Sequence, residues 1–257
     1  MKRPCILVTN DDGITAPGIN ALVLSLSLIG DVVVVAPDSE KSAVGHAITL
    51  SDPLRVSGFS KNGKWEGFAV NGTPADCVKI AVGALMENRP DLVVSGINLG
   101  SNTGINVIYS GTVSAATEGT ILGIPSIAFS LTTYTNPIFQ PAANFARELV
   151  NIVLTKKLPL KTLLNVNVPN VPEEEIRGVR VTRQGMALFA ERFDKRADPR
   201  NRIYYWMTGN KIQMDEGDDV DDEVIKRNMI SITPIHYDMT NHEFVDDLKK
   251  WGIESEY

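Results

Sequence analysis

Short apolar runs alternate with segments of helical periodicity through the first half of the chain. Cys5–Thr9 and Val32–Ala36 are typical of buried strands, and apolar residues recur at helical spacing from Pro17 to Ile29. Gly30 is a natural end for that helix. A strand, a helix and a strand within about 30 residues form a βαβ unit, whose strands lie parallel with a right-handed crossover. The pattern therefore predicts a parallel sheet.

The same alternation continues along the chain. Further predicted strands are 47–50, 54–56, 66–70, 91–95, 125–130 and 163–168, and further predicted helices are 74–86, 112–122 and 141–154. In the helix at 74–86, Thr73 is the expected N-cap and Asp76 the acid at the third position. We predict an α/β fold: a Rossmann-like, doubly wound, mostly parallel sheet in a three-layer α/β/α arrangement.

The chain becomes more polar after Pro172. Strands are predicted at 179–182 and 203–206 on either side of charged sequence, and a strand at 230–235 precedes a helix at 241–251. We expect one domain over residues 1–257, with a core of about 1–176. We further expect a β-hairpin arm at about 177–230 and a C-terminal strand and helix at about 231–257.

Composition narrows the class of protein. The chain is 43% hydrophobic and 22% charged, as in ordinary globular proteins. Two cysteines without a Cys-x-x-Cys pair disfavour a disulfide scaffold and a structural zinc site. The apolar runs near the N-terminus are too short for a signal peptide or a membrane span, so we expect a cytoplasmic protein without a membrane partner. With three histidines in the chain, any metal site would rely mainly on oxygen ligands.

The net charge is unevenly distributed. It is 25 − 31 = −6, and the run 215–223 holds 7 of the 31 acidic residues, so the remainder carries 25 − 24 = +1. Residues 177–202 carry 8 basic and 3 acidic residues. We interpret the acidic run as a solvated loop, with contacts between basic and acidic segments of different subunits as the alternative. The basic segment lacks regularly interleaved aromatic residues, so no nucleic-acid partner is expected.

Two polar segments follow predicted strands at one edge of the sheet. Adjacent carboxylates at Asp11 and Asp12 repel each other and are costly to desolvate, which a divalent cation would relieve; a polar turn is the alternative. Residues 95–104 lack both the Gly-Lys-Ser/Thr ending of a phosphate loop and a Gly-x-Gly-x-x-Gly fingerprint. Their glycines indicate close approach of the backbone to an anion, or simply positive φ angles.

Two further segments lie at the same edge. Ser110-Gly111-Thr112 starts a helix, which suits either an anion site or plain N-capping. Ser42 follows the second strand, where a turn residue is the simplest interpretation. Together the four segments offer hard oxygen ligands for Mg²⁺ or Mn²⁺ beside donors for phosphate, which suits metal-assisted hydrolysis of a phosphate ester.

The motifs also resemble those of a known family, the SurE (survival protein E) 5′/3′-nucleotidases. The resemblance spans nearly the whole chain. The matching segments are Ile6-Leu7-Val8-Thr9-Asn10-Asp11-Asp12-Gly13-Ile14, Val35-Ala36-Pro37-Asp38, Gly72-Thr73-Pro74-Ala75-Asp76-Cys77-Val78, Ser95-Gly96-Ile97-Asn98-Leu99-Gly100, Tyr109-Ser110-Gly111-Thr112-Val113, Asn165-Val166-Asn167-Val168-Pro169 and Ser231-Ile232-Thr233-Pro234.

The resemblance implies a metal-dependent phosphatase acting on nucleoside monophosphates. One Mg²⁺ or Mn²⁺ ion per subunit would be held by Asp11, Asp12, Ser42 and Asn98, and Asp11 or Asp12 would accept a proton from the attacking water. The implied phosphate pocket consists of Asn102, Ser110, Gly111 and Thr112. The resemblance also implies a homodimer or homotetramer with exchanged C-terminal arms.

Several alternatives stay open. A nucleotide-binding regulatory module without turnover would carry the same motifs. The preferred base, the 5′ or 3′ preference and activity on short polyphosphate are not fixed by the sequence. His46 is either a hydrogen-bonded loop residue or a substrate contact.

Overall fold

Nine strands form one continuous sheet in the computed structural model, which describes residues 3–212, 214–215 and 217–255. Its strands are β1 (Cys5–Thr9), β2 (Asp31–Pro37), β3 (Val56–Ser60), β4 (Glu66–Val70), β5 (Leu92–Leu99), β6 (Ser126–Leu131), β7 (Thr162–Val168), β8 (Val179–Val181) and β11 (Ile230–His236). Their order is β3-β4-β2-β1-β5-β6-β7-β11-β8. The six neighbouring strands β4, β2, β1, β5, β6 and β7 are mutually parallel. Strand β3 runs antiparallel to β4, and β11 runs antiparallel to β7.

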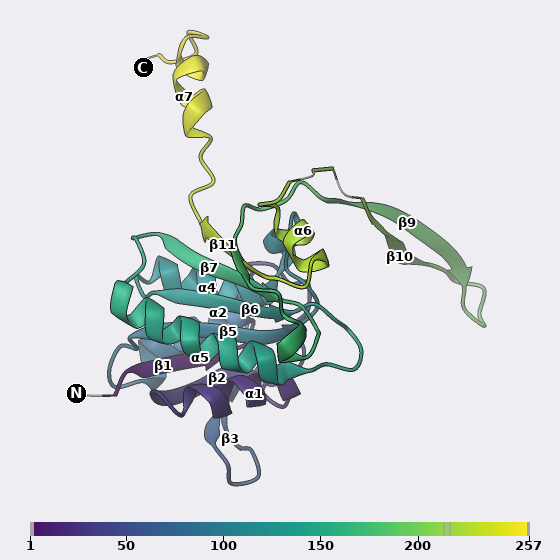
Figure 1. Cartoon of the computed structure of the whole chain (residues 1–257). Coiled ribbons are helices and arrows are strands. Elements are labelled where there is room, and N and C mark those ends of the chain that lie inside the picture. The colour runs from purple at the N-terminus through teal and green to yellow at the C-terminus, as the bar shows by residue number, and fades with distance from the viewer. Residues whose placement is uncertain (1–2, 213, 216, 256–257) are drawn as a thin grey trace.

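Helices cover both faces of the sheet (Figure 1). Helices α1 (Pro17–Leu26) and α5 (Phe139–Lys156) pack together on one face. Helices α2 (Pro74–Ile80) and α4 (Gly111–Ile121) pack on the other, with a π-helical turn at Ala81–Leu85 after α2 and the short helix α3 (Asn106–Tyr109) before α4. This confirms the predicted doubly wound α/β/α fold with its mostly parallel sheet.

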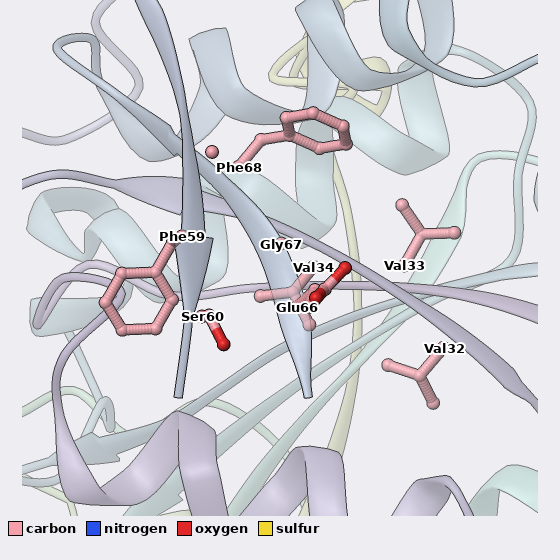
Figure 2. A pocket seen from close by; sticks show the side chains of 9 residues that line it. Val32, Val33, Val34, Phe59, Ser60, Glu66, Gly67 and Phe68 are labelled. Carbon is pink, nitrogen blue, oxygen red and sulfur yellow. The ribbon is translucent and has the colours of Figure 1, made fainter. Parts of the chain in front are cut away.

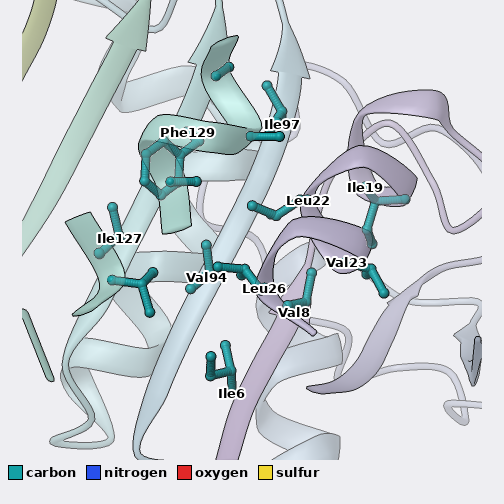
Figure 3. Close-up of a cluster of buried hydrophobic side chains, with 14 of the residues drawn as sticks. Ile6, Val8, Ile19, Leu22, Val23, Leu26, Val94, Ile97, Ile127 and Phe129 are labelled. Carbon is teal, nitrogen blue, oxygen red and sulfur yellow. The ribbon is translucent and has the colours of Figure 1, made fainter. Parts of the chain in front are cut away.

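The core follows from the two-residue period of the strands. Ile6 and Val8 of β1 join the apolar cluster under α1 and α5, whereas Leu7 points to the cluster under α2. Figure 3 shows Leu22 and Leu26 of α1 packed among these strand side chains. Each such fully buried side chain contributes about 1.5–3 kcal/mol to stability.

The start of α2 confirms the predicted capping box. The Thr73 hydroxyl accepts a hydrogen bond from the Asp76 backbone N–H at 3.1 Å, and Asp76 accepts one from the Thr73 N–H at 2.9 Å. Asp76 also accepts hydrogen bonds from the backbone and hydroxyl of Thr49. Burial alone would raise the pKa of Asp76, but these donors outweigh it and lower that pKa.

Some short strands differ from the prediction. Residues 47–50 are irregular rather than a strand, because Thr49 is held by the cap of α2 and not by a strand ladder. Strand β3 begins at Val56, whereas the prediction placed a strand at 54–56.

The polar arm is also built differently. Its hairpin consists of β9 (Leu188–Ala197) and β10 (Ile203–Ile212), paired antiparallel. The strand predicted at 179–182, within the expected arm, forms β8 and pairs in parallel with β11 at the edge of the main sheet. Alternation of polar and apolar residues in so short a strand does not reveal its partner. A 3-10 turn at Glu173–Glu175 precedes β8.

The acidic run is only partly solvated. Helix α6 (Asp221–Lys226) begins within it, and the fully buried Asp221 accepts hydrogen bonds from the backbone N–H groups of Gly104 and Gly185 at 2.9 and 3.0 Å. Arg183 of the basic segment pairs with Asp215 and, at 3.2 Å, with Asp219. The solvated-loop interpretation is therefore wrong for Asp221, and at Arg183 the opposite charges meet within one chain.

Two segments extend away from the body of the sheet (Figure 1). They are the hairpin β9–β10 and helix α7 (His242–Lys249), which follows β11 at the C-terminal end. Within the described ranges, no helix combines the length and apolar character that crossing a membrane requires.

Candidate active site

The candidate residues gather where β1 lies between β2 and β5. The chain leaves β1 toward β2 on one side, while β5 lies on the other, so the loops after these strands diverge and leave space at their carboxyl ends. Ligands in open α/β sheets bind at such a switch point. Asp11 and Asp12 follow β1, Asn98 is near the end of β5, and Ser42 follows β2.

Helix α4 begins directly against Asp11. The Thr112 hydroxyl donates a 2.5 Å hydrogen bond to Asp11 Oδ1, and Asp11 is 4% exposed. A Cβ atom on Gly111 would lie 2.8 Å from the Asp11 Cβ and 3.0 Å from its Oδ2. Ser110 caps the helix, since its Oγ accepts from the Val113 N–H at 3.1 Å. The first turn of α4, whose leading N–H groups have no partner within the helix backbone, therefore lies beside a buried carboxylate.

The two aspartates are in an unfavourable environment for paired negative charges. Burial raises the pKa of Asp11, and burial together with the charge of Asp11 raises the pKa of Asp12 to about 7. The Leu99 N–H donates to Asp12 Oδ2 at 3.2 Å, which ties the aspartate pair to the end of β5. A divalent cation at this position would relieve both the desolvation and the repulsion.

Asn98 and Ser42 are the two uncharged candidate ligands. The Asn98 side-chain amide donates to the Gly100 carbonyl at 2.9 Å, so its amide oxygen is the atom available for a metal. The Ser42 hydroxyl donates to Glu40 Oε1 at 2.6 Å, which leaves its lone pairs for a cation. In the part of the chain that the structure describes, no cluster of three or more His, Cys, Asp or Glu side chains could hold a metal. A metal here would therefore depend on serine and asparagine as well as on the two carboxylates.

The glycine-rich segment 96–104, which covers the end of β5 and the loop after it, adopts the backbone that its glycines permit. Gly96, Gly100 and Gly104 all have positive φ, as predicted. At Gly96 a Cβ atom would lie 2.4 Å from the Phe129 carbonyl oxygen, so a larger residue cannot fit. Strand β5 shifts its register with β6 between Ser95 and Asn98, which carries Asn98 out to the site.

Asn102 lies within this loop but its bonds are directed inward. Its side-chain amide donates to Ser130 Oγ at 2.8 Å, and its backbone N–H donates to Asn167 Oδ1 at 2.8 Å. The side-chain amides of Asn165 and Asn167 both donate to the Asn102 carbonyl. The structure thus places Asn102 as an anchor of the loop on β7, whereas Gly111 and Thr112 are at the aspartate pair.

The sequence assigned no role to the asparagines of β7, or to the ion-paired residues Glu118 and Lys79. Asn165 and Asn167 are two residues apart on a strand, so they share a face, and polar residues within an apolar strand were the available signal. The second group is Glu118 of α4 with His46 and Lys79, at 2.9 and 2.8 Å. Among the two alternatives for His46, the structure shows the hydrogen-bonded loop residue.

One hollow lies away from the candidate residues. A hollow of about 530 Å³ lies between the first half of β2 and the β3–β4 hairpin (Figure 2). Its lining includes Val32, Val33, Val34, Phe59 and Phe68. The candidate residues lie at the opposite, carboxyl end of β2, so cavity size does not identify the site.

Comparison with known proteins identifies the family of this chain. The family model described as Survival protein SurE matches residues 6–191. A protein of Syntrophobacter fumaroxidans named 5′-nucleotidase SurE is 52% identical over 248 residues, covering 96% of this chain and 99% of the relative. A protein of the same name from Syntrophus aciditrophicus is 53% identical over 244 residues, covering 95% of this chain and 92% of the relative. The crystal structure of the SurE protein from Aquifex aeolicus superimposes with a TM-score of 0.84 at 42% identity, covering 97% of this chain and all of the other. The chain belongs to the SurE family.

Proposed function

We propose that this protein is a metal-dependent nucleotidase, which hydrolyses nucleoside 5′-monophosphates, and also 3′-monophosphates, to nucleoside and phosphate. The observation that carries the proposal is the contact of the α4 N-terminus with Asp11, through Thr112 and Gly111. This contact places a helix N-terminus, a kind of site that suits phosphate, next to a carboxylate pair suited to a cation. The relatives from Syntrophobacter and Syntrophus that share about half of the sequence are named 5′-nucleotidases.

One divalent ion per subunit, Mg²⁺ or Mn²⁺, would be held by Asp11, Asp12, Ser42 and Asn98. All four present hard oxygen donors, which these ions prefer, and the raised pKa values of the two aspartates mark a place where a cation is favoured. When bound, such an ion polarises a phosphoryl oxygen and activates water for attack.

The chain itself supplies the phosphate contacts and the proton acceptor. The backbone N–H group of Gly111 would bind a phosphate oxygen, since the first turn of a helix leaves it without an intrahelical partner, and the Thr112 backbone bonds to Asp11 beside it. The Thr112 hydroxyl fixes the orientation of Asp11. In this scheme Asp11 or Asp12 accepts the proton of the attacking water.

These contacts address a phosphoryl group and not a particular base or sugar. We therefore extend the proposal to short polyphosphate as a second substrate class. Release of phosphate from tripolyphosphate by the purified protein, under the conditions of the nucleotide assay, tests this extension.

The central test is hydrolysis of AMP and GMP by the purified protein. We expect phosphate release that EDTA abolishes and that Mn²⁺ or Mg²⁺ restores. Asp12→Ala should reduce the metal-dependent rate by at least about 10³-fold, because it removes a ligand and half of the carboxylate pair. Asp52→Ala, at an exposed position before β3, is the matched control and should keep the rate.

Two results would contradict the proposal. Full metal-dependent turnover by Asp12→Ala would show that the site is elsewhere. Tight binding of AMP without any turnover in either metal would instead favour the nucleotide-binding regulatory module.

We also propose a homodimer or homotetramer in which C-terminal arms are exchanged. The support is exposed apolar surface on the two segments that leave the body. Trp206 of β10 and Trp251 after α7 are 58% and 67% exposed, and Phe244 contacts Trp251 in an edge-on arrangement with ring centroids 5.7 Å apart. Aromatic side chains on extended segments are typical of surfaces that bind another chain.

A further inference from the structure

Ser42 differs from the other three candidate ligands in how the fold holds it. Asn98 lies in the paired part of β5, and Asp11 and Asp12 follow directly after the paired residues of β1. Ser42 is on an exposed stretch in the irregular segment between the end of β2 at Pro37 and the start of β3 at Val56. Its position therefore depends on individual contacts of what we call the Ser42 loop, residues 39–47.

Contacts on both sides of Ser42 tie this loop to the site. Before Ser42, the Lys41 N–H donates to the Asp11 carbonyl at 2.7 Å. After it, the Gly45 N–H donates to the Tyr109 carbonyl at 3.0 Å, and His46 Nε2 lies 2.9 Å from Glu118 Oε2. The last of these is a side-chain contact that joins the loop to helix α4, whose N-terminus abuts Asp11.

Glu118 is well suited to hold the loop. Its side chain is 3% exposed, and Lys79 of α2 donates to its other oxygen, Oε1, at 2.8 Å. Burial alone would raise the pKa of Glu118, but the bonds from His46 and Lys79 outweigh it and lower that pKa. Glu118 is thus a buried, charged anchor with one oxygen for the Ser42 loop and the other for α2.

We propose that His46 is a positioning residue for the metal: through Glu118 it fastens the Ser42 loop to α4 and so sets the Ser42 hydroxyl beside the aspartate pair. This inference rests on the metal site of the proposed function. It assigns His46 no contact with substrate or metal. Loss of the His46–Glu118 bond should loosen Ser42 and weaken metal binding while leaving the strand-end ligands in place.

The chain offers matched variants that separate this role from general packing. His46→Ala and His46→Asn both break the contact, because asparagine is too short to reach Glu118. His46→Gln keeps an amide N–H at a reach similar to that of the imidazole Nε2. Lys79→Met removes the other partner of Glu118 without touching the Ser42 loop.

The experiment is calorimetric titration of the metal-free, full-length variants with Mn²⁺ alone. We expect His46→Ala and His46→Asn to weaken the Mn²⁺ affinity by about tenfold, the lower end for loss of an outer-shell partner. His46→Gln should recover most of that affinity, and Lys79→Met should stay within about twofold of the unsubstituted protein. Steady-state kinetics should agree, with a raised Mn²⁺ concentration for half-maximal rate and a nearly unchanged kcat at saturating Mn²⁺.

Each opposing outcome has a definite meaning. Equal Mn²⁺ affinity of His46→Asn and the unsubstituted protein would overturn the positioning role. An equal loss in Lys79→Met would also overturn it, because it would show that packing of α2 on α4 is what matters. No Mn²⁺ binding by the unsubstituted protein, with turnover intact, would overturn the proposed metal site itself. Should His46→Ala unfold, the comparison of glutamine with asparagine decides the question.

Discussion

The switch point of the sheet buries polar side chains, whereas the two protruding segments expose aromatic ones. At the switch point, polar side chains such as Asp11 and Thr112 are buried and bonded to each other. On β10 and around α7, aromatic side chains such as Trp206 and Trp251 are exposed. A buried polar group must find its partner within the fold, whereas an exposed aromatic group stays costly until another surface covers it.

The difference in burial separates the candidate site from the surfaces proposed for assembly. The carboxylate pair and the α4 N-terminus come together from residues of one chain, so this part of the site needs no second subunit. The hairpin β9–β10 pairs only with itself in the described part of the chain, and it extends from the body as Figure 1 shows. We therefore expect catalysis and assembly to respond to different substitutions.

The largest expected effect concerns assembly. The double variant Phe244→Ser with Trp251→Ser removes the aromatic pair around α7, and we expect it to lower the oligomeric state, measured by light scattering during gel filtration. Leu28→Ser, which changes an exposed apolar residue on the body, should leave the oligomer intact. If the unsubstituted protein is monomeric at all concentrations, the claim that the protruding segments mediate assembly is wrong.

The next effect concerns the contact of α4 with Asp11. Gly111→Ala would place a Cβ atom 2.8 Å from the Asp11 Cβ and 3.2 Å from Pro74, so the helix end must shift away from the aspartates. We expect kcat/KM for AMP to fall by about 100-fold, since small displacements of a positioned group have such effects. The oligomeric state should be unchanged.

Gly83→Ala is the control, because a Cβ atom there meets nothing within 4 Å. It should leave kcat/KM unaltered. Activity of Gly111→Ala equal to that of Gly83→Ala would show that the α4 N-terminus does not take part in phosphate binding.

The sequence predicted the switch point better than the protruding segments for a physical reason. Continuous apolar runs such as Ile6–Val8 and Leu92–Val94 are best satisfied by burial on both faces of a parallel sheet. Once that sheet is assumed, Asp11 and Asn98 must lie at the same edge, and the structure places them there.

Elsewhere the local pattern was compatible with several partners. Three residues of β8 cannot specify whether they pair with a hairpin strand or with β11. Asp221 looked like part of a solvated acidic run, because its bonds to Gly104 and Gly185 join residues more than 30 positions away in sequence. His46 and Glu118 are 72 positions apart, so their contact was equally invisible.

The smallest effect concerns the cost of holding two carboxylates at the switch point. In metal-free protein, the raised pKa of Asp12, about 7, means that the folded state favours its neutral form. Stability from this group is complete below the unfolded pKa near 4 and is lost as the pH rises through 7. Asp12→Asn removes that loss. At pH 8 in EDTA, its free energy of unfolding, measured in urea, should exceed that of the unsubstituted protein by about 1–2 kcal/mol after allowance for partial exposure. The advantage over the unsubstituted protein should widen from pH 4 to pH 7 and shrink when Mn²⁺ is added, because the cation stabilises the unsubstituted pair.

An Asp12→Asn protein that is less stable at pH 8, or whose advantage does not change with pH, would show that the pair is not strained in the absence of metal. The exposed Asp52→Asn should show neither trend.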